Sequence, residues 1–109
     1  MRGKIIQVIS IFSLAVIISC SPKLYKPAQV HSEWVTENVG TASVSELLQG
    51  RIMYIAACQG CHYLHYPSEF TRGEWEKIFP EMSTRANLND STSSLVYSYL
   101  LAGAADTKP

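Results

Sequence analysis

Residues 50–62 read Gly-Arg-Ile-Met-Tyr-Ile-Ala-Ala-Cys-Gln-Gly-Cys-His, and the last five of them form the motif C-x-x-C-H over Cys58, Cys61 and His62. This pattern is typical of covalent haem attachment. Two thiols separated by two residues near a helix end can both reach the vinyl groups on one porphyrin edge, and the adjacent imidazole can bind the iron. The motif therefore predicts one covalent haem c, held through Cys58 and Cys61, with His62 as an iron ligand.

Three other interpretations of the motif have weaker support. A thioredoxin-like C-x-x-C pair expects a βαβ context, which the sequence lacks. A structural zinc ion takes four ligands, so that His65 or His31 would have to add the fourth. A plain disulfide between the two cysteines would leave His62 without a role.

The chain before the motif has helical periodicity. Ser43 or Ser45 can cap the start of a helix. Apolar residues then recur at spacings of three and four, which is typical of the core-facing stripe of an amphipathic helix. They are Val44, Leu47, Leu48, Ile52 and Ile55. We expect this helix to run into Cys58.

Two further helices are predicted after the motif. Thr71 and Glu74 match a capping box, and the helix that follows has an apolar side formed by Trp75, Ile78, Phe79 and Met82. Pro80 should kink or end this helix near Phe79. Residues 86–94 are rich in Asn, Asp, Ser and Thr and are expected to form a loop. A last helix should end at Gly103, with an apolar side formed by Leu95, Val96, Tyr99 and Leu100.

The pattern as a whole predicts an all-α fold, because it has no strand alternation, internal repeat or second domain. A globule of about 60 to 65 residues usually needs a disulfide, a metal or another staple to be stable. A tightly bound haem would serve, since its apolar macrocycle becomes the centre of the core. This argument is independent of the motif and points to the same cofactor.

The flanks of the motif resemble small single-haem bacterial cytochrome c domains, over about residues 45–101. Gly50 lies eight residues and Tyr54 four residues before Cys58, as in that family's Gly-x-x-x-aromatic-x-x-x-C-x-x-C-H helix. The resemblance implies a compact fold of three to four helices wrapped around one covalent haem. It also implies that Gly50 permits a close crossing of the first and last helices, with Tyr54 packed at the crossing.

The resemblance also implies a second iron ligand. In the compact members of the family a tryptophan helix leads to a ligand methionine, and here Trp75 is followed by Met82. Met53, on the entering helix, is expected to be core packing. His65 lies too close behind the motif histidine to reach the opposite haem face, and His31 is the remaining alternative.

Residues that surround the motif are expected to support the haem. In the family a proline carbonyl after the motif often accepts a hydrogen bond from the ligand histidine, which fixes its orientation, and Pro67 is the nearest candidate. The haem wall is expected to consist of Tyr63, Leu64, Tyr66, Phe70, Trp75 and Phe79.

The N-terminus predicts export and lipidation. A basic start is followed by fourteen uncharged residues, Ile5 to Ile18, too few to span a membrane and typical of a signal peptide. Residues 17–20, Ile-Ile-Ser-Cys, resemble a bacterial lipobox, which implies that residues 1–19 are removed and that Cys20 carries lipid. Ser21 is not a retention aspartate, which weakly favours the outer membrane as the site of a periplasm-facing anchor.

The domain boundary is placed at residue 43. Residues 20–42 contain Pro22 and Pro27 and no helical period, so they are expected to form a tether between the membrane and a cytochrome c domain over residues 43–109. Trp34 and Val35 are unexpected in a spacer and could fold back on the domain.

These observations together predict an electron-transfer protein rather than an enzyme. A His/Met pair fills both axial positions of the iron, so that no substrate can bind there. Redox proteins of the periplasm or membrane are the expected donor and acceptor. The alternative is a haem enzyme, or a gas or redox sensor, with an open sixth position. Residues 20–109 carry seven basic and nine acidic residues, without a basic patch, and no nucleic acid partner is expected.

Overall fold

The computed structural model of the chain describes residues 24–58 and 64–109. These residues form four α-helices and one short 3-10 helix, and no strand occurs among them: α2 (Gln29–Asn38), α3 (Val44–Cys58), η1 (Pro67–Glu69), α4 (Arg72–Arg85) and α5 (Asp90–Ala102). The all-α prediction is confirmed. None of the helices in this part of the chain is both long and apolar enough to cross a membrane.

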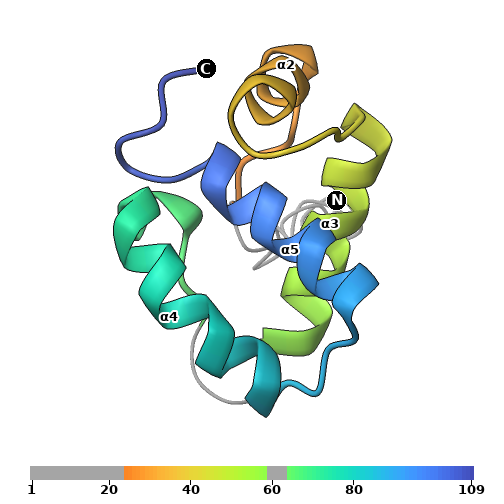
Figure 1. Cartoon of the computed structure of the whole chain (residues 1–109), viewed down its shortest axis with the longest axis vertical. Helices are drawn as coiled ribbons and strands as arrows, with labels where there is room; N and C mark the ends of the chain where they lie inside the picture. Colours follow the sequence, from red (N-terminus) through yellow and green to blue (C-terminus); the bar gives the residue numbers. More distant parts are fainter. Residues whose placement is uncertain (1–23, 59–63) are drawn as a thin grey trace, which may run out of the picture.

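The crossing of α3 and α5 is the main helix contact of the fold (Figure 1). Gly50 is buried at this crossing, and a Cβ atom there would lie 2.2 Å from the Leu95 carbonyl oxygen of α5. Only glycine lets the two backbones approach this closely. Tyr54 packs beside it, with its ring 6.2 Å from that of Tyr99. The expected close crossing at Gly50 is therefore confirmed.

The buried face of α3 differs from the predicted one. Leu47, Gly50, Tyr54 and Cys58 are buried, whereas Leu48 and Ile52 are 38% and 62% exposed. Both sets repeat at helical spacing, so periodicity alone cannot choose between neighbouring faces. The close approach to α5 at Gly50 fixes the choice, because it turns the side of α3 that carries Gly50 and Tyr54 inward. The start of α3 is as expected, since Ser43 Oγ accepts a hydrogen bond from the Glu46 amide at 3.2 Å.

The boundary at residue 43 also differs from the structure. Within the proposed tether, residues 24–42 fold onto the domain, and α2 contacts both α3 and α5. Val35 is fully buried beside Leu47, and Ser32 Oγ donates a hydrogen bond to the Ala42 carbonyl at 2.6 Å. Pro22 and Pro27 made the composition of this segment typical of an extended spacer, although α2 follows them. Residues 20–23, including Cys20, lie outside the described part of the chain.

Trp34 has a partner in the folded unit. The Arg72 guanidinium carbon lies 5.6 Å from the centre of the Trp34 ring, a distance at which a cation is attracted by the ring face. Trp34 therefore joins α2 to the start of α4 and is not a residue of a free spacer.

Helix α4 continues through Pro80 to Arg85, contrary to the expected stop near Phe79. Pro80 is exposed, so water can reach the carbonyl that loses its backbone partner, while the buried Trp75 and Phe79 hold the helix against the core. The capping box is confirmed, because Thr71 Oγ1 accepts from the Glu74 amide at 3.2 Å.

Helix α5 begins earlier than predicted. It starts at Asp90, with Asn89 Oδ1 accepting a hydrogen bond from the Thr92 amide at 2.8 Å. Within the polar stretch 86–94, the residues up to Asn89 precede the helix, and those from Asp90 onward belong to α5. Ser, Thr, Asp and Asn favour both settings, which explains the misplaced boundary.

Candidate functional site

A cavity of about 320 Å³ lies between the end of α3 and the second half of α4. These two helices lie on opposite sides of α5, and their C-terminal ends approach each other at the lower end of the view in Figure 1. The cavity is lined by Ala57, Cys58, Ile78, Glu81, Met82, Arg85 and Ala86. It therefore joins the first cysteine of the motif and the expected methionine ligand in one site.

Each sulfur is positioned by its own helix. Cys58 is the last residue of α3 and is 7% exposed, in contact with the core. Met82 lies one turn after Ile78 on α4 and is partly buried. Because the two residues come from different helices and line the same cavity, a group bound between them would contact both.

The other proposed ligands fall into two groups. His31 lines a different cavity, together with Tyr25 and Gly103, and its Nδ1 accepts a hydrogen bond from the Ala28 amide at 3.0 Å. Burial lowers the pKa of His31. Cys61 and His62 lie outside the described residues, as does the lipidation candidate at position 20.

Met53 has the packing role expected of it. It is partly buried and packs against the core cluster that contains Tyr54 and Cys58. It does not line the cavity that holds Met82. Of the two methionines of residues 24–58 and 64–109, Met82 is thus the one placed at the cavity.

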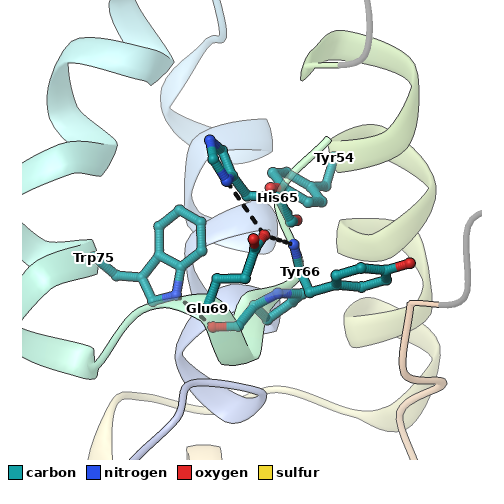
Figure 2. A network of polar contacts seen from close by, with 6 residues as sticks. Tyr54, His65, Tyr66, Glu69 and Trp75 are labelled. Carbon is teal, nitrogen blue, oxygen red and sulfur yellow. Dashed lines mark hydrogen bonds and ion pairs between the residues drawn. The ribbon is translucent and has the colours of Figure 1, made fainter. Parts of the chain in front are cut away.

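Pro67 has a partner other than the expected one. Its carbonyl accepts a buried hydrogen bond from the indole Nε1 of Trp75 at 2.8 Å, as Figure 2 shows. The Pro67 carbonyl, which was expected to accept a proton from the ligand histidine, therefore already accepts one hydrogen bond. A carbonyl oxygen has a second lone pair, but no contact of Pro67 with His62 can be stated, because that residue lies outside the described part.

The segment directly after the motif is fixed by a polar network that sequence reasoning missed (Figure 2). Tyr54 Oη donates to the His65 carbonyl at 2.7 Å, and Glu69 Oε2 accepts from the Tyr66 amide at 2.5 Å. Glu69 Oε2 also lies 3.2 Å from His65 Nδ1. Glu69 stands three residues after Tyr66, the spacing of a capping box, and this signal could have been found.

Tyr54 acts in this network as a neutral donor. Burial is the first cause that raises its pKa, and the nearby Cys58 adds to it. The phenol hydrogen bond ties α3 to His65, in the segment that follows the motif.

The expected haem wall is arranged differently. Trp75 and Phe79 are buried, Leu64 and Phe70 are partly buried, and Tyr66 is 43% exposed, but none of them lines the cavity. Phe70 and Tyr54 instead pack edge-on against Trp75, with ring centres 4.9 and 6.5 Å away. Tyr63 lies outside the described residues. The described part of the cavity wall combines small and apolar side chains with the charged side chains of Glu81 and Arg85.

The donor set at the cavity is compatible with a covalent haem. Cys58 supplies a thiol at the end of a helix, Met82 a thioether and Ala57 and Ile78 apolar surface. Arg85, whose Nη2 lies 2.7 Å from Glu81 Oε1, is a cation at the same cavity that can pair with an anionic group. Among residues 24–58 and 64–109 no three His, Cys, Asp or Glu side chains form a metal cluster.

Comparisons with known proteins add no family to these observations. No family model matches the chain, and neither a curated protein nor a solved structure matches it.

Proposed function

We propose that the protein is a lipid-anchored electron-transfer cytochrome with one haem c, bound through Cys58 and Cys61 and ligated by His62 and Met82. The observation that carries this proposal is the shared cavity. Cys58 belongs to the C-x-x-C-H motif, Met82 lies 24 residues further along the chain, and the fold brings both to one cavity. The sequence alone predicts both residues as contacts of the haem.

The bound haem would supply the one-electron chemistry, and the protein would supply ligands, burial and orientation. Cys58, buried at the end of α3, holds one edge of the site in place. Met82 would supply the second protein ligand of the iron, which would leave no place for a substrate there. Ala57 and Ile78 line the cavity and would present apolar surface to the bound group.

One observation favours a second candidate function, a haem enzyme or a sensor with an open axial position. Arg85 lines the cavity beside Met82, and a cation next to an open iron position can stabilise a bound anion or a developing charge. Its ion pair with Glu81 reduces the charge that it offers. We therefore place electron transfer first.

Covalent attachment is tested on protein produced in a cell with cytochrome c maturation. After denaturation and extraction with acidified organic solvent, the polypeptide should retain its haem and the corresponding mass. Cys58→Ser should leave at most one thioether bond, and Cys58→Ser with Cys61→Ser should lose all haem in the same extraction. Complete release of haem from the unaltered protein contradicts the proposal.

Lipidation is tested separately, on the intact chain. Protein with Cys20 should carry acyl mass and float with membranes, whereas Cys20→Ser should lose both, because several acyl chains on one residue are what hold such a protein firmly. The proposed periplasm-facing location, with the outer membrane weakly favoured, is read from the membrane fraction. Unchanged mass and flotation after Cys20→Ser contradict the anchor.

A further inference from the structure

The outer face of α3 is an apolar stripe that nothing in the described part of the chain covers completely. We call Val44, Leu48, Ile52 and Ile55 the α3 stripe. Leu48 is 38% and Ile52 62% exposed, and the other two are partly buried. Single exposed apolar residues are normal, but a contiguous row of them marks a surface that meets another apolar phase.

The chain enters the domain beside this stripe. Arg51 Nε donates to the Tyr25 carbonyl at 3.2 Å, and Arg51 Nη2 donates to the Leu24 carbonyl at 3.4 Å. Arg51 lies three residues after Leu48 and four before Ile55, and residues at these spacings are neighbours on a helix surface. The entry point at Leu24 is therefore adjacent to the α3 stripe.

The entry point is also rigidly held. Leu24 is 5% exposed and belongs to the core cluster. The Tyr25 ring stacks on Tyr99 with centres 4.6 Å apart, and each hydroxyl donates to the other residue's carbonyl, at 2.5 and 3.1 Å. Pro27 is buried as well. Leu24, Tyr25 and Pro27 consequently hold this segment against the core, so that it cannot lengthen a spacer.

The length of chain before Leu24 determines how far the domain can stand from its anchor. Three residues, Ser21 to Lys23, separate Cys20 from Leu24. At about 3.3–3.6 Å per residue, four steps along a fully extended chain span at most about 14 Å. That distance is comparable to the depth of the headgroup layer on one side of a bilayer plus a short margin.

We propose that the α3 stripe rests on the lipid surface, with Leu48 and Ile52 immersed at the boundary between headgroups and acyl chains. This inference rests on the lipidation of Cys20 under the proposed function. The occupant is a bilayer because the anchor leaves the domain no room to stand away from it, and because the stripe flanks the point of entry. A shallow apolar helix face is what interfacial helices bury in lipid.

The arrangement restricts the redox partner. Cys58 ends the same helix that carries the stripe, so the haem cavity is held close to the membrane plane. A partner embedded in the membrane or bound to it can reach this site, whereas the protein cannot swing to distant soluble partners on its tether.

Hydroxyl-radical footprinting of the full mature protein tests this proposal without altering the stripe. Lipidated holoprotein is bound to phosphatidylethanolamine–phosphatidylglycerol vesicles and compared with the soluble Cys20→Ser protein. We expect oxidation of Leu48 and Ile52 to fall at least threefold on vesicles. Pro80, which is exposed on α4 across α5 from the stripe, should keep its reactivity and serves as the internal control.

Two outcomes overturn the proposal. Leu48 and Ile52 could stay as reactive on vesicles as in solution, although the protein carries lipid and floats with the vesicles. Alternatively, the oxidation of Leu48 and Ile52 could be as low in the soluble Cys20→Ser protein as in the vesicle-bound protein. A second copy of the chain would then cover the stripe. A protein that lacks acyl mass and does not float contradicts the anchor of the proposed function instead, so the two failures are distinguishable.

Discussion

The aromatic cluster and the cavity at the ends of α3 and α4 are built in opposite ways. The aromatic cluster, Tyr25, Tyr54, Phe70, Trp75 and Tyr99, is closed: its polar atoms have partners within the chain, and three of its rings are fully buried. The cavity is less enclosed, with a volume of about 320 Å³ and with Met82 in its lining only partly buried.

The two regions differ in how closely the helices around them pack against one another. α3 and α5 meet closely over Gly50, whereas α4 contacts α5 less extensively. α4 meets α3 through the aromatic cluster, where Trp75 packs edge-on against Tyr54. Small domains often need a cofactor or another staple to be stable. Under the proposed function, the haem would bind at this cavity and add apolar surface to the core.

The largest effect is expected from breaking the aromatic cluster. Trp75→Ala removes a fully buried indole and leaves the Pro67 carbonyl without its donor. We expect the free energy of unfolding of the matured protein to fall by about 3–5 kcal/mol, measured by guanidinium denaturation. Ile52→Ala on the exposed face of α3 is the control and should change it by about 0.5 kcal/mol or less. Equal losses in the two variants would remove the distinction between a closed core and an open surface.

A smaller effect separates two glycines. Gly50→Ala should force α3 and α5 apart, because its Cβ would lie 2.2 Å from the Leu95 carbonyl oxygen, and overpacking of this kind costs about 1–3 kcal/mol. Gly73→Ala, in the first turn of α4 with nothing within 4 Å of the added atom, should instead stabilise by about 0.5–1 kcal/mol. Thermal denaturation should show a lower melting temperature for Gly50→Ala and a higher one for Gly73→Ala. Stabilisation by Gly50→Ala would contradict the close crossing.

The smallest effect is expected in the pH dependence of stability that arises from His31 on α2. Burial lowers the pKa of His31, so below its ordinary value of about 6.5 the unfolded chain binds a proton more readily than the folded chain. Stability should therefore fall on acidification through that range. His31→Asn, whose side-chain oxygen can still accept from the Ala28 amide, should lose this part of the dependence. Unfolding curves for both proteins between pH 7 and pH 5 measure it, and identical pH profiles would show that α2 does not bury His31 in solution.

Local signals in the sequence predicted much of this architecture, and long-range contacts account for what they missed. The cap at Thr71 and the helix that runs into Cys58 depend on neighbours in sequence, whereas the crossing at Gly50 was implied by the family resemblance. The buried face of α3 and the helix through Pro80 depend on which side of each helix meets α5, and neither is encoded by spacing alone. Met82 was chosen by resemblance, and the fold places it beside Cys58.

α2 is a helix that local signals in the sequence did not predict. Its proline-flanked sequence favours a spacer, and its burial depends on residues such as Leu47, 12 positions beyond Val35. The polar network around Glu69 lies in a segment without helical periodicity, so the spacing of Tyr66 and Glu69 alone did not predict it.

The most direct test of the central claim is the visible spectrum of the oxidised protein and of two methionine variants. A methionine sulfur on the iron gives a weak band at the red end of the spectrum, which bis-histidine haem lacks, and raises the reduction potential. We predict that the band is present in the unaltered protein, persists in Met53→Ala and disappears in Met82→Ala, with a lower potential and binding of carbon monoxide. Absence of the band in the unaltered protein, or its survival in Met82→Ala, would contradict the assignment of the cavity as a His/Met haem site.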